Sequence, residues 1–385
     1  MHIDSNGSRP ASEQHAARSE ASTARSALSA PAPSRIRGEF HPLTVADVTR
    51  LCDDAVAVTF DVPDHLAARY DFQPGQSLVL RRHVDGREER RNYSICAPAG
   101  APPRIGVREV PDGLFSTWLV QDIQPGDEIE VSPPTGSFTP DPDVPGHHVL
   151  VVAGSGITPA LSIAASVLRH PETTVTLLYG NRRTSTVMFA EELADLKDRY
   201  PTRLDLIHVL SREPREVELF TGRLDADRLR ALLPLLGDPA LVDQWWLCGP
   251  FGMVTDIQDL LLDYDVPRER VHQELFYVGD LPPTPATHPE ADIEGSEVCV
   301  RLDGRTTTVA VPAGTSVLEG AQRGRPDLPF ACKGGVCGTC RAKVTSGKVD
   351  LRRNFALEQS ELDEGFVLTC QSHPITNTVE IDYDA

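Results

Sequence analysis

The sequence predicts a multidomain protein with three folded parts: an antiparallel β-barrel, an α/β domain with a parallel sheet, and a small α+β domain. The first observation is the length of 385 residues, which is enough for about two or three domains. The second is a change of pattern near residue 144, from short alternating strands to apolar strands separated by amphipathic helices. The third is a proline-rich segment that separates residues 296–385 from the rest.

Composition excludes several classes of protein. Apolar residues make up 40% of the chain, which supports buried cores. A net charge of -19 argues against binding to nucleic acid or to an anionic membrane surface. There is no apolar run long enough to cross a membrane and no secretory signal pattern, so a cytoplasmic location is expected. In that compartment, the eight cysteines are expected to be thiols or metal ligands rather than disulfides.

Residues 1–38 are predicted to be a disordered tail, because they contain almost no large apolar side chain. A transit peptide would share the richness in Arg and Ser. Such peptides avoid acidic residues, however, and this segment contains Asp4, Glu13 and Glu20.

Residues 39–143 are predicted to form the barrel, with about six strands. Segments 55–60, 77–80 and 104–108 alternate with period two and are separated by Pro-Gly and Asp-Gly turns. Residues 144–278 are predicted to form the α/β domain, with right-handed crossovers between parallel strands. Its expected strands are 148–153, 174–179, 203–210, 244–248 and 271–276, and its expected helices start at 159 and span 188–199, 225–236 and 251–263.

A linker is predicted over residues 279–295, which contain several prolines. Residues 296–385 are predicted to form the α+β domain, with strands at 297–302, 305–311 and 378–383. A helix capped by Thr315 is expected before a cysteine-rich loop.

Cys332, Cys337, Cys340 and the distant Cys370 have the spacing C-x4-C-x2-C…C, which is typical of a plant-type [2Fe-2S] centre. Glycines in the loop allow its backbone to turn tightly around a cluster. A zinc site usually shows two short cysteine or histidine pairs instead. A disulfide framework would require a secreted chain.

In the barrel, Arg91, Tyr93 and Ser94 place a cation, an aromatic ring and a hydroxyl on one strand. A flavin nucleotide needs groups of these kinds, although any strand can carry Arg and Tyr. Downstream, Gly113 and Ser116 stand at the start of a short helical run, and a helix N-terminus can bind a pyrophosphate.

In the α/β domain, Gly154 and Gly156 follow a buried strand and precede a helix, with Thr158 as predicted N-cap and Pro159 at the first helical position. The two glycines would let the backbone approach a pyrophosphate on the helix dipole. The alternative is a tight strand-to-helix turn without a ligand.

Arg182 follows the next strand, and Ser211 and Arg212 follow the third. An NAD-specific fold would place an acidic residue after the second strand, so these arginines favour the 2′-phosphate of NADPH. The alternative is that both arginines are solvated surface residues.

Cys248, Gly249 and Pro250 end the fourth predicted strand, where parallel sheets bind ligands, although a strand cysteine is often just core. Glu274 and Phe276 lie at the end of the last strand and indicate little by themselves.

In their order along the chain, these motifs resemble a ferredoxin–NADP reductase module fused to a plant-type ferredoxin, across residues 40–385. The resemblance implies an FAD-binding barrel, an NADPH-binding Rossmann-like domain and a β-grasp ferredoxin domain. It further implies that Arg91 holds the FAD phosphates, Tyr93 stacks on the flavin ring and Ser94 lies near flavin N5. Cys248 and Glu274 would close on the nicotinamide.

The expected function is NADPH-dependent electron transfer through FAD and the [2Fe-2S] cluster to a separate multi-subunit oxygenase. Segments 330–337, 340–345 and 347–350 are similar to reductases of ring-epoxidising di-iron oxygenases, whereas the segment from Glu358 to Ser372 is shared with reductases of Rieske oxygenases. A third possibility, from another class, is a redox sensor or electron carrier that does not turn over.

Overall fold

The computed structural model describes residues 39–385 except 85, 112, 277–294 and 358. The predicted tail over 1–38 and nearly all of the predicted linker over 279–295 lie outside the described residues. All described residues belong to one compact unit. No helix among them is long and apolar enough to cross a membrane.

The predicted barrel is a six-stranded antiparallel sheet with the order β4-β3-β6-β1-β2-β5. Its two edges approach each other beyond β4, where Ile95 forms a bridge with Ile105 and the Cys96 N–H donates to the Arg104 carbonyl. Alternating residues fill the interior, including Leu43, Phe60 and Leu80. The elements are β1 (His41–Cys52), β2 (Ala55–Asp61), η1 (Asp64–Arg69), β3 (Ser77–Val84), β4 (Arg87–Ser94), β5 (Arg104–Arg108), α1 (Leu114–Gln121) and β6 (Glu128–Val131).

The α/β part is a five-stranded parallel sheet with the order β11-β10-β7-β8-β9. Its elements are β7 (His147–Ala153), η2 (Gly154–Gly156), α2 (Ile157–Val167), β8 (Thr174–Asn181), η3 (Thr184–Thr186), α3 (Ala190–Arg199), β9 (Leu204–Leu210), η4 (Glu218–Phe220), α4 (Ala226–Leu236), η5 (Pro239–Leu241), β10 (Gln244–Cys248), α5 (Phe251–Asp263), η6 (Arg268–Arg270) and β11 (Val271–Glu274). The chain reverses its direction of winding between β7 and β10, the position at which such sheets bind ligands.

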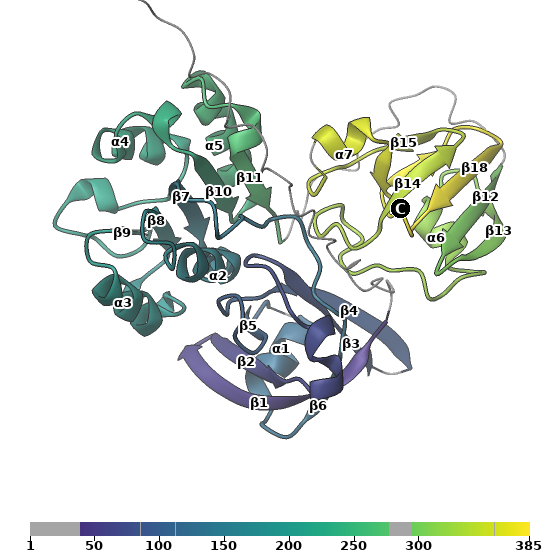
Figure 1. The fold of residues 1–385 in the computed structure, drawn as a ribbon, viewed down its shortest axis with the longest axis horizontal. Helices are drawn as coiled ribbons and strands as arrows, with labels where there is room; N and C mark the ends of the chain where they lie inside the picture. Colours follow the sequence, from purple (N-terminus) through teal and green to yellow (C-terminus); the bar gives the residue numbers. More distant parts are fainter. Residues whose placement is uncertain (1–38, 85, 112, 277–294, 358) are drawn as a thin grey trace, which may run out of the picture. The chain divides into compact units, whose positions relative to one another are not determined.

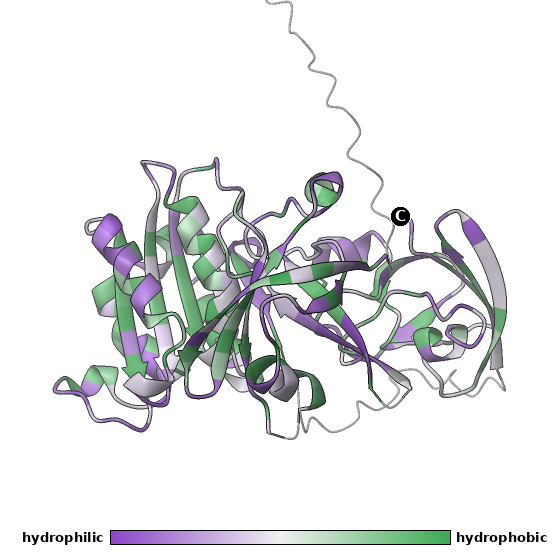
Figure 2. Cartoon of the chain, turned by 90° about the horizontal axis from the view of Figure 1, so that it is seen from below, coloured by the Kyte–Doolittle hydropathy of each residue, from purple (hydrophilic) through white to green (hydrophobic). Residues whose placement is uncertain are grey.

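Two layers of helices cover this sheet. α2 and α3 pack on one face, and α4 and α5 pack on the other (Figure 1). Because both faces are covered, successive residues in the middle of β7 and β8 are buried, and Figure 2 shows the strands of this sheet as largely hydrophobic.

The C-terminal part is a five-stranded mixed sheet with the order β13-β12-β18-β14-β16, together with a two-stranded antiparallel sheet of β15 and β17. Its elements are β12 (Gly295–Leu302), β13 (Arg305–Pro312), α6 (Val317–Ala321), β14 (Arg341–Ser346), β15 (Val349–Leu351), α7 (Gln359–Asp363), β16 (Phe366–Leu368), β17 (Ser372–Pro374) and β18 (Thr378–Asp382). The prediction that Thr315 caps the helix before the cluster loop is wrong. Ser316 caps α6 instead, because its extended backbone lets its hydroxyl accept the Glu319 N–H at 3.3 Å.

Candidate active site and cluster loop

Ser94, Cys248 and Glu274 come together although they are far apart in the sequence. β10 and β11 are parallel neighbours whose register places Cys248 beside Glu274. The Glu274 carboxylate accepts a hydrogen bond of 2.9 Å from the Ser94 hydroxyl at the end of β4. Three residues predicted for one site therefore meet where the barrel contacts the parallel sheet.

Burial controls the protonation of Glu274 and Cys248. It raises the pKa of Glu274 to about 7, and the hydrogen bond from Ser94 acts in the opposite direction. Burial, helped by the nearby Glu274 charge, also raises the pKa of the Cys248 thiol well above its usual range. At neutral pH the site combines an uncharged thiol, a hydroxyl and a carboxyl that can gain or lose a proton near this pH. Such a set can donate hydrogen bonds and hold a proton.

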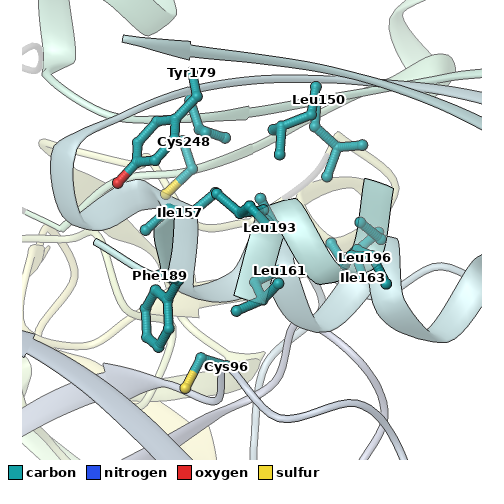
Figure 3. Packing of buried hydrophobic residues seen from close by; sticks show 14 of the residues in the cluster. Cys96, Leu150, Ile157, Leu161, Ile163, Tyr179, Phe189, Leu193, Leu196 and Cys248 are labelled. Atoms are coloured by element: carbon teal, nitrogen blue, oxygen red, sulfur yellow. The ribbon is translucent and has the colours of Figure 1, made fainter. Parts of the chain in front are cut away.

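The turn after β7 differs from its predicted geometry. Gly154–Gly156 form a 3₁₀ turn that runs directly into α2, so the helix begins at Ile157 and Pro159 is its third residue. Thr158 is already helical and is not the N-cap. Its hydroxyl donates to the Ser155 carbonyl at 3.0 Å. Figure 3 shows Cys248 lying close to Ile157 at the start of this helix.

The two glycines of this turn serve different purposes. A Cβ on Gly156 would lie 2.2 Å from the Cys248 carbonyl oxygen, so the absence of a side chain lets the turn pack against β10. Gly154 has a φ of +58°, a left-handed conformation that glycine adopts easily. A Cβ on Gly154 would lie 3.5 Å from a terminal guanidinium nitrogen of Arg108.

Arg108 is a candidate that the sequence analysis missed. It ends β5 and donates a hydrogen bond to the Thr186 carbonyl, and its Nε lies 3.3 Å from Asp54. Its guanidinium therefore stands beside the turn that precedes α2, where a phosphate could contact both a cation and helix N–H groups. The sequence signal was weak, because nothing local to β5 shows which edge of the barrel contacts the α/β domain.

Along β4, Arg91 and Tyr93 follow each other at the two-residue spacing of one strand face. The Arg91 guanidinium contacts Glu89 at 3.0 Å and its side chain is 46% exposed. Tyr93 packs against Phe115 of α1, with ring centres 6.2 Å apart. A cation, an aromatic ring and the helix N-terminus at Gly113 thus line one region of the barrel, which fits a nucleotide with a flat ring.

Ser116 forms a hydrogen bond within its own turn, whereas Phe276 is partly exposed beyond its strand. The Ser116 hydroxyl accepts the Val110 N–H at 3.0 Å and so stabilises the turn before α1. β11 ends at Glu274, which leaves Phe276 beyond the strand with 38% of its surface exposed.

Arg182 and Arg212 are neighbours through their backbones. The pairing of β8 and β9 continues past both strands, because the Ser211 N–H donates to Asn181 and the Arg212 N–H donates to Arg182 at 2.8 Å. Glu213, which the sequence analysis did not consider, accepts two hydrogen bonds from Thr184 at 2.8 and 2.7 Å. These bonds lower the pKa of Glu213, and the charges of Arg215 and Arg183 act in the same direction, so a carboxylate is fixed directly after Arg212 in the chain.

The four predicted cluster ligands converge in two pairs. A hydrogen bond from Cys337 lowers the pKa of Cys332, and a hydrogen bond with Cys370 raises the pKa of Cys340. No group of three or more possible ligands surrounds a single point within the described part of the chain. Two pairs fit a [2Fe-2S] cluster, because its four thiolates are divided between two irons.

The loop also presents donors toward these sulfurs. The Gly334 N–H lies 3.3 Å from the Cys332 sulfur, and Gly335 and Gly338 have φ of +82° and +66°. The positive φ values turn the backbone tightly, as the glycine-rich spacing predicts.

Three features define the class of protein. The barrel has a surface suited to a nucleotide, the parallel sheet has a glycine turn where its winding reverses, and the C-terminal part has a four-cysteine loop. These features define a flavin-dependent oxidoreductase that uses a pyridine nucleotide and a [2Fe-2S] centre. Family models agree with this class. An oxidoreductase FAD-binding domain matches residues 42–139, an oxidoreductase NAD-binding domain matches 150–259, and a 2Fe-2S iron-sulfur cluster binding domain matches 300–374.

Known relatives narrow the class further. The chain is 41% identical to one of the subunits of the 1,2-phenylacetyl-CoA epoxidase of Escherichia coli, over 90% of this chain and 98% of that protein. It is 33% identical to the ferredoxin reductase component of 3-ketosteroid-9-alpha-monooxygenase of Rhodococcus rhodochrous, over 89% and 96%. The chain therefore belongs to the family of flavin and iron-sulfur reductase components of oxygenases, which pass electrons from NAD(P)H through FAD to [2Fe-2S].

Solved structures share the fold. Phthalate dioxygenase reductase matches with a TM-score of 0.54 at 23% identity, covering 89% of this chain and 98% of that one. An intact type IV self-sufficient cytochrome P450 monooxygenase matches with a TM-score of 0.67 at 20% identity, covering 89% and 41%.

Proposed function

We propose that this chain is the reductase of a multi-subunit oxygenase that epoxidises the ring of phenylacetyl-CoA, with NADPH as its electron donor. The observation that supports this choice is the 41% identity to the phenylacetyl-CoA epoxidase protein, compared with 33% for the steroid monooxygenase component at similar coverage. Charge supports an oxygenase acceptor, since exposed Lys333 and Lys348 belong to the cluster domain of an otherwise acidic chain.

The proposed residue roles are supported by the positions of these side chains. FAD, when bound, accepts a hydride and releases electrons singly, and the cluster carries them one at a time. Arg91 and the α1 N-terminus at Gly113 would hold the flavin phosphates, and Tyr93 would cover the ring. Ser94, Cys248 and Glu274 would surround the reacting ends of flavin and nicotinamide, with water excluded by the buried strand ends. Positioning is their main contribution.

The nucleotide would bind along the carboxyl ends of β7, β8 and β10. Gly154, Arg108 and the start of α2 would hold its pyrophosphate, with Gly249 and Pro250 beside the nicotinamide. Arg182 and Arg212 would hold the 2′-phosphate. Glu213 opposes this preference, because its carboxylate repels a phosphate but can accept hydrogen bonds from ribose hydroxyls.

The test mixes purified reductase, NADPH, oxygen and phenylacetyl-CoA with the phenylacetyl-CoA oxygenase, and in parallel mixes the reductase with a Rieske steroid hydroxylase and its steroid. Coupled formation of the CoA epoxide, with one NADPH consumed per product, is expected. Coupled product with the Rieske enzyme alone would replace this proposal by the steroid alternative. A protein that reduces neither oxygenase and turns over ferricyanide less than once per flavin would be a sensor or carrier.

A further inference from the structure

Arg90 is an almost fully buried cation that the proposed site does not use. It lies on β4 next to Arg91, and its side chain is 3% exposed. Its Nε donates to Glu88 at 2.7 Å. The guanidinium carbon lies 5.0 Å from the centre of the Phe40 ring and 4.3 Å from the centre of the Phe330 ring. The cation therefore contacts two aromatic rings.

The two rings belong to different parts of the chain. Phe40 immediately precedes β1 of the barrel, and the guanidinium of Arg81 also lies over its ring, at 4.1 Å from the ring centre. Phe330 belongs to the cluster domain and precedes the ligand Cys332 by two residues. A cation–π contact strengthens when it is removed from water. Phe330 therefore contributes to covering Arg90.

A second aromatic contact joins the cluster domain to the nucleotide-binding part. Phe355 packs edge-on against Phe251, with ring centres 5.1 Å apart and planes at 76°. Val336, inside the cluster loop, is 4% exposed and packs in the same apolar cluster as Met253 of α5. Phe251 begins α5, directly after Gly249 and Pro250. The loop thus contacts both halves of the reductase close to the candidate active site.

We propose that Arg90 is a positioning residue which, through Phe330, holds the cluster loop against the flavin-binding strand and so sets the rate of electron transfer from flavin to cluster. The proposal rests on the electron path of the family and not on the identity of the external acceptor. Electron transfer weakens steeply with distance, so a loop held in one position transfers faster than one that samples many. The competing explanation is that Arg90 only fills the edge of the barrel, where Glu88 and Phe40 already satisfy it.

Hydrogen exchange provides the first test, because amide exchange reports opening even when the closed state dominates. The variants are Arg90→Gln, Phe330→Leu and their combination. Each single change should speed exchange of the amides in 87–94 and 328–340 by roughly tenfold, the effect of losing one desolvated cation–π contact. In the double variant the exchange should rise by less than the product of the two single effects, because both changes remove the Arg90–Phe330 contact. The effects need not be identical, since Phe330→Leu also removes the Lys333 contact at 4.5 Å and Arg90→Gln also changes the contacts to Glu88 and Phe40.

Two further variants serve as controls. Arg82→Gln removes a guanidinium on the neighbouring strand whose aromatic contact, 4.0 Å from the Trp118 ring, lies within the barrel. It should leave exchange in 328–340 unchanged. Phe330→Tyr keeps an aromatic face and should behave like the parent protein. If Arg90→Gln folds poorly, the comparison of Phe330→Leu with Phe330→Tyr still tests the proposal.

Stopped-flow absorbance provides the second readout on the flavin- and cluster-loaded protein. Cluster reduction after NADPH mixing should slow by a similar factor in Arg90→Gln and Phe330→Leu, while the preceding flavin reduction keeps its rate. Unchanged exchange and unchanged cluster reduction in both variants would overturn the proposal. So would equal effects from Arg82→Gln, or a Phe330→Tyr variant that behaves like Phe330→Leu.

Discussion

Glu274 shows how strongly one side chain depends on its surroundings. Its strand gives it no obvious role, yet folding places it against Ser94 and next to Cys248, and burial raises its pKa to about 7 from 4.5. The folded state therefore binds a proton more tightly than the unfolded state. This group's contribution to stability is full below pH 4.5 and is lost as pH rises to about 7.

A Glu274→Gln variant should remove this dependence in the protein without flavin. Between pH 5 and pH 8 the parent should lose up to about 3 kcal/mol of unfolding free energy relative to the variant, at 1.36 kcal/mol per pKa unit. Urea unfolding followed by tryptophan fluorescence measures this, because Trp245 and Trp246 lie in the same sheet. Glu191→Gln, at an exposed position of α3, is the control. Parallel pH curves for parent and Glu274→Gln would contradict the assignment.

A second prediction concerns the preference for NADPH over NADH, which we expect to depend on the residues that follow β8 and β9. Changing Arg182 and Arg212 to Ala should weaken NADPH by about tenfold each and leave NADH nearly unaffected, since a charge-assisted bond contributes about 1.5 kcal/mol or more. Glu213→Gln should act in the opposite direction and strengthen NADPH. KM values for both nucleotides with ferricyanide as acceptor measure this. Equal losses for NADPH and NADH would show that these arginines do not bind the 2′-phosphate.

At the level of elements, the sequence predicted what depends on local pattern. The central parallel strands are buried on both faces and the helices are amphipathic, so β10 and α5 have the predicted bounds. Helix starts were less accurate. Thr158 and Thr315 are good N-cap residues by type, but the first is already helical and the second precedes the true cap by one position. Contacts such as Ser94 with Glu274, or Arg108 with the Gly154 turn, depend on how two sheets meet, which no local pattern encodes.

The turn after β7 allows a prediction at this scale. Gly156 has a φ of −61°, which any residue adopts, so only space forbids a side chain there. Gly156→Ala should destabilise the protein by about 2–4 kcal/mol, because its Cβ would overlap the Cys248 carbonyl and neither backbone can move easily. Gly252→Ala, on α5 with no atom within 4 Å of the new Cβ, should be neutral or stabilise slightly. Thermal unfolding compares them, and equal shifts in Tm would refute the packing argument.

For the whole molecule, the charged residues are unevenly distributed. The chain carries -19 overall, yet its cluster domain has exposed Lys333 and Lys348. Two other cations of this domain form ion pairs, since Arg341 contacts Glu361 at 2.7 Å and Arg352 lies 3.8 Å from Asp350. Lys333 contacts the Phe330 ring at 4.5 Å and Gln322 at 3.4 Å, and neither of these partners neutralises its charge. The side of the cluster loop with Val336 is covered by the reductase itself. We therefore expect the external oxygenase to approach the lysine side.

The final prediction tests this approach with the phenylacetyl-CoA oxygenase as acceptor. Raising ionic strength from about 0.1 to about 1 M shortens the Debye length from about 10 to about 3 Å. Raising the salt should therefore slow the reduction of the oxygenase much more than it slows the reduction of small acceptors. Lys333→Gln and Lys348→Gln should each reduce the second-order rate at low salt and flatten its salt dependence. Arg301→Gln, on β12 and next to Asp382 and Asp384, should have little effect. If all three variants keep the parent's salt dependence, the oxygenase does not bind through these lysines, and an acceptor surface elsewhere on the cluster domain would have to be sought.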